Sequence, residues 1–356
     1  MAAGPMKVLV ATDAWHPQVN GVVRTLGSLA RAAGQLGAAI EFLSPDGFPS
    51  FQLPTYPGLR LAVPSRRGIA ERIEAASPDA IHIATEGPIG FAVRAYCRRN
   101  ARPFTTSYTT RFPEYISARS PIPESWIYAV LRWFHAGATV TMVATPSLMN
   151  ELSQRGFAHL GMWTRGVDVD LFRPDRAIEL PFPRPIFMTV GRVAVEKNLD
   201  AFLSLDLPGS KVVIGAGPEE ARLKREFPEA KFLGPLENGT LAAHLAAADV
   251  FVFPSRTDTF GIVQLEALAS GVPIAAFPVT GPKDVVGNNP IGVLHEDLGR
   301  ACIEALELPR DACRQFALAC SRENSASQFL GHVRKVANGG SRDLEAAITV
   351  TETAAG

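Results

Sequence analysis

The feature that most constrains the fold is a regular alternation of short apolar segments with longer amphipathic ones. The apolar segments are rich in Val, Ile, Ala and Phe and are bounded by turn-forming residues, which is typical of buried strands. Strands that alternate with helices favour a parallel, doubly wound sheet of the α/β class. The expected strands are KVLVAT, AIEFLSP, DAIHIAT, PFTTSYTT and TVTMVATP in the first half, and IFMTVGR, KVVIGAG, KFLGPL, DVFVFPS and VPIAAFP in the second.

This alternation is interrupted once, between Trp163 and Pro185, by a segment rich in Pro and charged residues. The chain has 356 residues, and a single hydrophobic core stops growing near about 250–300 residues. We therefore predict two Rossmann-like domains that face an interdomain cleft, with residues 6–172 in the first and residues 173–335 in the second. The terminal helix either stays with the second domain or packs back on the first. Residues 338–356 are expected to form a flexible tail.

The composition narrows the class of protein. Hydrophobic residues make up 47% of the chain and charged residues 20%, as in soluble globular proteins, and no apolar run reaches the ~18 residues that span a bilayer. The start of the chain has one Lys and no apolar secretory segment, which predicts a cytoplasmic protein. Four cysteines form no C-x-x-C pair and seven histidines show no metal-ligand spacing, so we expect reduced, structural thiols.

The charge is unevenly distributed along a chain whose net charge is zero. Residues 1–175 carry +4 and residues 176–356 carry −4. This asymmetry is too weak for sequence-independent nucleic-acid binding, so we expect no nucleic-acid partner. A basic first half suits an anionic ligand or a membrane surface, although an uneven solvated surface explains it equally well.

Three loops carry residues suited to phosphate groups. Gly21 lies before the first helix, where the missing Cβ lets a backbone N–H approach an anion. Arg192 and Lys197 follow the first strand of the second half, and such a pair can neutralise a diphosphate. Gly215 and Gly217 form a turn that also permits close backbone approach. Each pattern alone is equally that of an ordinary turn or a solvated loop, and the first is not a G-x-G-x-x-G motif.

Two carboxylates bracket one helix start. Asp258 lies in the loop after DVFVFPS, and Glu266 lies about two turns into the following helix. Thr259, Phe260 and Gly261 are expected to begin that helix, so that their N–H groups and the helix dipole form a phosphate site. Glu266 can accept two hydroxyl groups of a sugar or ribose. Phosphate donors beside hydroxyl acceptors predict a nucleotide-sugar site, and the alternative is that both acids only brace the helix.

A possible metal motif lies in the linker. The segment RGVDVD contains Asp168 and Asp170 in the D-x-D pattern that binds Mn²⁺ or Mg²⁺ in metal-dependent sugar transferases. Here the pattern is not at the end of a strand within a domain. We therefore expect no metal and no other cofactor.

Seven motifs together make the chain similar to glycosyltransferase family four, whose members are retaining enzymes of GT-B fold. The resemblance covers nearly all of residues 6–335. Within the family it is strongest to bacterial transferases that glycosylate diacylglycerol-type lipids, and to related mannosyltransferases. It implies that the second domain binds a nucleotide-sugar donor and the first an acceptor. The motifs are NGVVRTL, TEGPIG, SYTTRFPEY, RGVDVDLFRP, GRVAVEKN, GAGP and TDTFGIVQLEALASGVP.

The resemblance also implies a role for each matching position. Arg192 and Lys197 would hold the diphosphate, Asp258 would hold hydroxyls of the donor sugar, and these three would carry catalysis. The other implied positions are Glu266 at the ribose, Gly21, Gly215, Gly217, Phe260 and Gly261 at the phosphates and sugar, and Tyr108, Thr109 and Arg111 on the acceptor side.

Two positions depart from the family pattern. Asp258 stands where the family has Glu, and the side chain that is one methylene shorter would move the sugar or select another epimer. Thr109 stands in SYTT where the family has His. Because Thr does not titrate near neutral pH, an acid or base role is absent at this position. A mechanism in which the leaving phosphate takes the acceptor proton does not need it.

These observations predict a retaining transferase that moves a hexosyl or hexuronosyl unit from a UDP- or GDP-linked donor to a hydroxyl group, with a membrane lipid favoured as acceptor. Trp126–Ala136 places aromatic residues beside Arg132, and Arg94–Arg102 is basic, so both segments suit the cytoplasmic face of an anionic bilayer. A core-facing helix and a solvated face are the alternative. Two other functions stay open: nucleotide-sugar binding without transfer, which Thr109 motivates, and epimerisation of a UDP-sugar.

Overall fold

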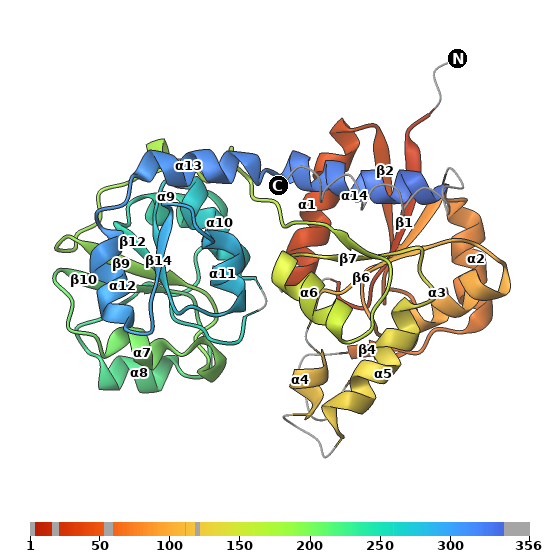
Figure 1. Ribbon diagram of the computed structural model, residues 1–356, viewed down its shortest axis with the longest axis horizontal. Coiled ribbons are helices and arrows are strands. Elements are labelled where there is room, and N and C mark those ends of the chain that lie inside the picture. Colours follow the sequence, from red (N-terminus) through yellow and green to blue (C-terminus); the bar gives the residue numbers. More distant parts are fainter. Residues whose placement is uncertain are drawn as a thin grey trace. The chain divides into compact units, whose positions relative to one another are not determined.

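The computed structural model describes residues 4–15, 21–52, 60–110, 112–117, 122–258 and 260–337. It divides the chain into two compact units (Figure 1): unit 1 is Met1–Thr164 with Ser325–Gly356, and unit 2 is Arg165–Asn324. The chain thus changes unit after Thr164, whereas the linker composition predicts a boundary after residue 172. The reason is that Val167 pairs with Ser321 and Phe172 packs in the core of unit 2.

Unit 1 contains a six-stranded parallel sheet with the order β2-β1-β5-β6-β7-β8. The direction in which strands are added reverses between β1 and β5, so the loops after these two strands meet at one edge. A small antiparallel hairpin of β3 and β4 lies outside this sheet. The strands are β1 (Met6–Ala11), β2 (Ala38–Leu43), β3 (Ser50–Gln52), β4 (Arg60–Ala62), β5 (Ala80–Ile83), β6 (Thr105–Ser107), β7 (Val140–Val143) and β8 (Leu160–Met162).

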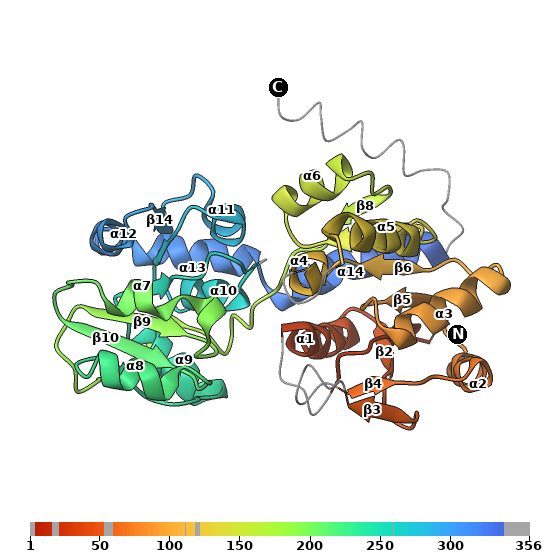
Figure 2. The ribbon, with the colours of Figure 1, turned by 90° about the horizontal axis from the view of Figure 1, so that it is seen from below.

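Helices cover both faces of this sheet, because side chains alternate along each strand (Figure 2). Val8 and Val10 pack with helix α1 (Gly21–Gln35) on one face. Leu9 and Ala11 pack with α2, α3 and α5 on the other. The remaining helices of unit 1 before Thr164 are α2 (Arg66–Ala76), α3 (Pro88–Arg99), α4 (Phe112–Ser117), α5 (Glu124–His135) and α6 (Pro146–Gln154).

The last helix, α14 (Arg322–Ala337), returns to unit 1. Its residues Phe329 and Leu330 are fully buried in the same cluster as α1. Trp163 packs against Phe329 with ring centroids 5.0 Å apart and ring planes tilted by 51°, and it donates its indole N–H to the Ser325 hydroxyl at 3.1 Å. A buried indole needs such a partner, so α14 belongs to the core of unit 1.

Unit 2 contains a second six-stranded parallel sheet, with the order β11-β10-β9-β12-β13-β14. This is the order of dinucleotide-binding folds, and it reverses between β9 and β12. The strands are β9 (Ile186–Val190), β10 (Ser210–Ile214), β11 (Lys231–Phe232), β12 (Val250–Phe253), β13 (Ile274–Ala276) and β14 (Gly292–Leu294). The pattern of apolar segments predicts all of them except β14.

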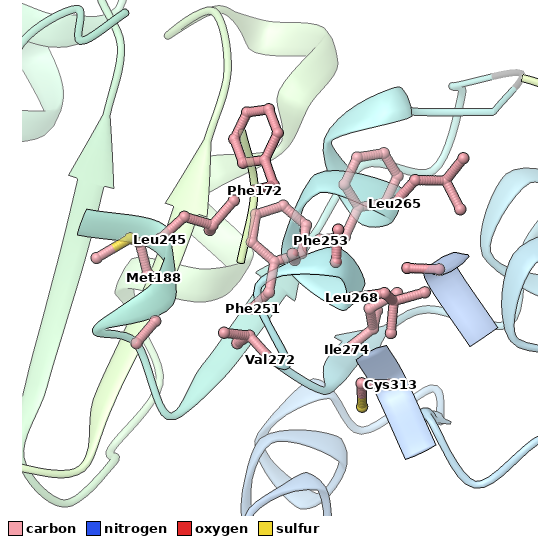
Figure 3. Close-up of a cluster of buried hydrophobic side chains, with 14 of the residues drawn as sticks. Phe172, Met188, Leu245, Phe251, Phe253, Leu265, Leu268, Val272, Ile274 and Cys313 are labelled. Carbon is pink, nitrogen blue, oxygen red and sulfur yellow. The ribbon is translucent and has the colours of Figure 1, made fainter. Parts of the chain in front are cut away.

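The core of unit 2 also has two layers. Phe251 and Phe253 of β12 point to the face covered by α9 (Asn238–Ala246), α10 (Ile262–Ala269), α11 (Thr280–Val286) and α13 (Arg310–Ala319). Figure 3 shows these rings with Leu265 and Leu268 of α10. The opposite face packs against α7 (Leu199–Leu203), α8 (Glu220–Glu226) and α12 (Leu298–Ala305). Both faces are apolar, which explains why the strands read as continuous hydrophobic runs.

The four cysteines are unpaired thiols. Burial raises the pKa of Cys97, Cys302 and Cys313 to about 12, so these thiols are unreactive core residues. Within the described residues, no helix is long and apolar enough to cross a membrane.

Candidate functional site

The candidate donor site lies where the strand order of unit 2 reverses. Ligands of open α/β sheets bind outside the carboxyl ends of the strands at such a point. The loop after β9 carries Arg192 and Lys197, and the loop after β12 carries Asp258. The fold therefore brings together two loops that are far apart in the sequence: Lys197 and Asp258 are separated by 61 residues.

Lys197 and Asp258 form an ion pair in the structure. The Lys197 ammonium donates to both carboxylate oxygens, at 2.7 Å to Oδ1 and 2.6 Å to Oδ2. The two side chains are 27% and 22% exposed, so the pair is partly shielded from water but reachable. The side chain predicted to bind the diphosphate, Lys197, thus contacts the side chain predicted to bind the sugar, Asp258.

The backbone of the two loops holds this pair in place. Asn198 has the left-handed conformation, with φ of 53°, and its side-chain amide donates to the Pro254 carbonyl at 3.0 Å. The Ser255 hydroxyl donates to the Glu196 carbonyl at 3.2 Å. These two hydrogen bonds join the loops next to Lys197 and Asp258, so they hold the backbone of the ion pair in place.

Arg192 stands apart from the ion pair. Its side chain is 56% exposed and lies 3.6 Å from Glu196. An exposed pair of this length contributes little to stability. The guanidinium therefore stays available to a ligand.

Helix α10 begins later than expected. Thr259 lies outside the described residues, and Gly261 is the N-cap with φ of 75°, so the first helical residue is Ile262 rather than a residue of 259–261. A Cβ at Gly261 would approach the ring of Phe253 to 2.5 Å, which requires glycine. Glu266 follows inside the helix and is buried, with 3% of its surface exposed.

Gly215 and Gly217 have a packing requirement within unit 2. A Cβ at Gly215 would lie 1.8 Å from the Gly191 carbonyl oxygen, and one at Gly217 would lie 2.1 Å from that of Val193. These two glycines therefore let the loop after β10 press against the loop that carries Arg192. By contrast, a Cβ at Gly21, the first residue of α1, would have no described heavy atom within 4 Å.

The residues predicted to lie on the acceptor side follow β6 in unit 1. Tyr108 is 1% exposed and its ring lies 5.9 Å from that of His135 and 6.0 Å from that of Phe157. Thr109 is half-buried, and its hydroxyl is buried with no hydrogen-bond partner among the described residues. Arg111 lies outside the described residues.

The segment TEGPIG after β5 is organised by Asp13, which the sequence analysis did not identify. The Asp13 carboxylate accepts hydrogen bonds from Ile89 N at 2.8 Å, Gly90 N at 3.3 Å and the Thr85 hydroxyl at 2.9 Å. Burial raises the pKa of Asp13, although these hydrogen bonds act in the opposite direction. A Cβ at Gly87 would lie 2.3 Å from Asp13 Cγ, so glycine is required there.

Glu86 and His135 form a second feature that the sequence analysis did not identify. His135 Nε2 lies 3.1 Å from Glu86 Oε1, and the two side chains are 2% and 1% exposed. The only signal in the sequence is the position of Glu86 between a buried strand and a Gly-Pro helix start.

Asp168 of the D-x-D pattern has structural partners. Its carboxylate accepts from Leu171 N at 2.9 Å and pairs with Arg322 at 2.8 Å. Among the described residues, no group of three or more His, Cys, Asp or Glu side chains could hold a metal ion.

Comparison with known proteins identifies the class. The model described as "Glycosyltransferase Family 4" matches residues 19–171, and the model described as "Glycosyl transferases group 1" matches residues 184–308. Together they span most of the chain and both units. The chain belongs to glycosyltransferase family four, and its two parallel α/β units are those of the GT-B fold.

Individual relatives refine this class. A GDP-mannose-dependent alpha-mannosyltransferase of Mycobacterium tuberculosis is 29% identical over 81% of this chain and 83% of its own length. The sulfoquinovosyl transferase SQD2 of Arabidopsis thaliana is 31% identical over 67% of this chain and 50% of its own length. A solved structure of Anabaena HepE in complex with UDP and glucose aligns with a TM-score of 0.68 over 92% of this chain and 99% of its own, at 15% identity. The chain is therefore a glycosyltransferase with a nucleotide-sugar donor.

Proposed function

We infer that this chain is a retaining glycosyltransferase that moves a hexosyl or hexuronosyl unit from a UDP- or GDP-linked donor to a hydroxyl group of a membrane lipid. The observation that carries the donor half is the Lys197–Asp258 pair at the reversal point of unit 2, with Glu266 buried in the adjacent helix. The activities by which the relatives are named, mannosyl and sulfoquinovosyl transfer, support this class.

The proposed reaction begins when the donor replaces the Lys197–Asp258 ion pair. When a diphosphate enters, Lys197 can donate to phosphate oxygens and Asp258 is left to accept hydrogen bonds from sugar hydroxyls. Lys197, Arg192 and the start of α10 then carry the negative charge that develops on the leaving diphosphate, so no metal is required. The acceptor oxygen bonds to the anomeric carbon on the face from which the phosphate oxygen departs. The acceptor proton passes to that phosphate oxygen, and Thr109 need not titrate.

Calorimetry with two carboxamide variants tests the donor site. Asp258→Asn should lower kcat more than it lowers affinity for the free nucleoside diphosphate, because sugar orientation matters most in the transition state. Glu266→Gln should weaken binding even of UDP or GDP without sugar. Asp168→Asn is a matched control, since Asp168 is also ion-paired in unit 2 and is 25% exposed against 22% for Asp258.

The outcomes separate the candidate functions. Equal losses of melting temperature in both variants, without loss of affinity, would mean that the acids only brace α10. If Asp258→Asn loses nucleotide affinity and Glu266→Gln does not, the two assignments are reversed. Donor binding without turnover in the presence of lipid would indicate a binding protein, and a changed donor epimer without acceptor would indicate an epimerase. An NMR spectrum of the product gives the anomeric configuration and tests retention.

The lipid acceptor is supported by the outer face of α5. Trp126, Val130 and Trp133 are 70%, 50% and 56% exposed and recur at the spacing of one helix face. The opposite face of the same helix, which includes Leu131 and Phe134, is buried. Exposed tryptophans of this kind are typical of membrane-interface segments.

Basic residues accompany this apolar face. The Arg94 guanidinium lies 3.8 Å above the Trp133 ring and donates to its carbonyl at 2.8 Å, which ties α3 to α5. Arg98 and Arg99 follow in the last turn of α3 and are exposed. Exposed tryptophans on α5 and exposed arginines on α3, the helix that Arg94 ties to it, suit the headgroup region of an anionic bilayer.

Flotation with vesicles tests this surface. Wild type should bind phosphatidylglycerol vesicles at low salt and be released at high salt, because exposed charges are screened. The double variant Trp126→Ser, Trp133→Ser should lose binding. Phe51→Ser, in β3 of the same unit and 50% exposed, is the matched control and should keep it. Equal binding to neutral and anionic vesicles, or none to either, would favour a soluble acceptor.

A further inference from the structure

Strand β6 carries hydroxyl groups on both of its faces. Side chains alternate along a strand, so Thr105 and Ser107 point to one face and Thr106 to the other. On the first face His82 Nδ1 lies 2.9 Å from the Thr105 hydroxyl, and its Nε2 lies 3.2 Å from that of Ser107. On the second face His135 Nδ1 lies 2.9 Å from the Thr106 hydroxyl. Each face of this short strand therefore holds one buried histidine.

The two histidines differ in their remaining partner. Both hydrogen-bond contacts of the His82 ring are with hydroxyl groups, whereas His135 also meets the Glu86 carboxylate at 3.1 Å. The imidazoles are 0% and 2% exposed. A buried carboxylate is costly, and an apolar pair of similar volume often stabilises a core better. The polar pair of Glu86 and His135 therefore calls for a reason other than stability.

The pair belongs to a chain of polar groups that reaches three neighbouring strands. Glu86 follows β5, His135 contacts Thr106 of β6, and the Thr106 hydroxyl lies 3.0 Å from that of Thr141 in β7. The second oxygen of Glu86 is buried and has no hydrogen-bond partner among the described residues. Such a network fixes the relative position of its members more tightly than apolar packing does.

The network ends at the acceptor-side residues. Thr106 is two residues before Tyr108, the Tyr108 ring lies 5.9 Å from that of His135, and the Tyr108 N–H donates to the Met142 carbonyl at 2.9 Å. Thr109 comes next, with a buried hydroxyl that has no partner among the described residues. His135 thus holds the segment from two sides, at the strand through Thr106 and at the ring of Tyr108.

We propose that Glu86 and His135 form a positioning pair for the Tyr108–Thr109 segment, which orients that segment toward the acceptor hydroxyl. Neither residue touches the reacting atoms. The carboxylate fixes the imidazole, and the imidazole fixes Thr106 and Tyr108. The kinetic part of this inference rests on the proposed function, whereas its effect on the order of the segment does not.

The experiment uses the full chain with Glu86→Gln, His135→Gln and the double variant. His82→Gln is the matched control, since it replaces an equally buried histidine on the opposite face of the same strand. Hydrogen exchange of the peptide covering residues 104–110 measures the order of the segment. Turnover is measured with dioleoylglycerol in phosphatidylglycerol vesicles, and nucleoside diphosphate affinity by calorimetry.

Glu86→Gln and His135→Gln should each speed exchange of residues 104–110, and should raise the KM for the lipid by about tenfold, the factor that corresponds to 1.4 kcal/mol. Nucleotide affinity should stay unchanged because the donor site lies in unit 2. The double variant should lose no more than either single one, since the residues act as a unit. His82→Gln should lower stability without raising the lipid KM.

Three results would overturn the proposal: unchanged exchange of residues 104–110 in Glu86→Gln, additive losses in the double variant, or an equal KM increase in His82→Gln. If Glu86→Gln does not fold, Thr106→Val removes the hydroxyl at the other end and should give the same exchange and KM changes. If wild type turns over no donor, the proposed function fails. Faster exchange in Glu86→Gln but not in His82→Gln would then still support the positioning pair.

Discussion

Acidification should destabilise unit 1 through His82. The ring is fully buried between Thr105, Ser107 and the aromatic rings of Trp163 and Phe329. Burial, with a smaller contribution from the nearby His332, lowers the pKa of His82 to about 3. A histidine whose folded pKa lies below its unfolded pKa binds fewer protons when folded. Its contribution to stability is therefore complete above about pH 6.5 and is lost as the pH falls toward 3.

The magnitude follows from the two pKa values. Between about pH 7.5 and pH 5, an unfolded imidazole gains roughly 2 kcal/mol of proton-binding free energy, while the folded imidazole gains almost none. The result is the same for any folded pKa below about 4, because such a group is unprotonated over this whole range. A loss of roughly 2 kcal/mol is large against the ~5–15 kcal/mol that stabilises a typical domain.

Urea denaturation followed by tryptophan fluorescence measures this effect. All four tryptophans, Trp15, Trp126, Trp133 and Trp163, belong to unit 1, so their fluorescence reports the unfolding of that unit. The free energy of unfolding of wild type should fall by about 2 kcal/mol more than that of His82→Gln between the two pH values. Asp13 titrates in both proteins and cancels in this comparison, whereas the coupling between His82 and His332 is part of the measured difference. Parallel pH dependences of the two proteins would refute the reasoning.

Three further outcomes are expected. Gly87→Ala should cost roughly 2–3 kcal/mol in thermal stability, because its Cβ would lie 2.3 Å from Asp13 Cγ, whereas Gly21→Ala, whose Cβ would have no described heavy atom within 4 Å, should leave the melting temperature unchanged. Lys197→Ala should weaken UDP or GDP binding by about 2–4 kcal/mol, and calorimetry that finds wild-type affinity would place the diphosphate elsewhere. The double variant Lys197→Ala, Asp258→Asn should recover part of that loss, because the unpaired carboxylate no longer repels the diphosphate.

The sequence predicts the architecture well because the signals for it are local. A buried strand needs a run of apolar residues wherever it lies in the sheet, so the long strands of both units could be recognised one at a time. The strands that were missed, β3, β4, β8 and β14, have three residues each. Length alone does not explain this, because β6 and β13 are equally short; the missed strands form the hairpin and one edge of each sheet, whereas β6 and β13 lie inside their sheets. Such strands are defined by the partner that they pair with, and no local pattern reports that partner.

The unit boundary shows a different limit of local patterns. Proline and charge between Trp163 and Pro185 correctly indicate a connecting segment, but composition does not say which core that segment covers. Val167 and Phe172 are apolar residues in this polar segment, and both are buried in unit 2. Their burial moves the division of the chain to Thr164, ahead of the position that the composition predicts.

The candidate site shows which of its features are local. The spacing of Asp258 and Glu266 around one helix is a local pattern and could be read directly. The bond between Lys197 and Asp258 joins residues 61 positions apart, and Asp13 caps α3 from 76 positions away. Both contacts depend on which strands become neighbours, so they appear only in the folded chain.

The contrast between the two reversal points explains why the anionic donor is expected in unit 2. In unit 1 the reversal point is between β1 and β5, and the first amides of α3 already donate to the Asp13 carboxylate. A phosphate at this helix start would displace a buried acid and meet its charge. In unit 2 the corresponding loops carry Lys197, which we propose exchanges its partner Asp258 for a phosphate. Both sheets have a reversal point, but the residues placed there differ. Asp13 disfavours an anion at the start of α3 in unit 1, whereas Lys197 offers an anion a positive charge in unit 2.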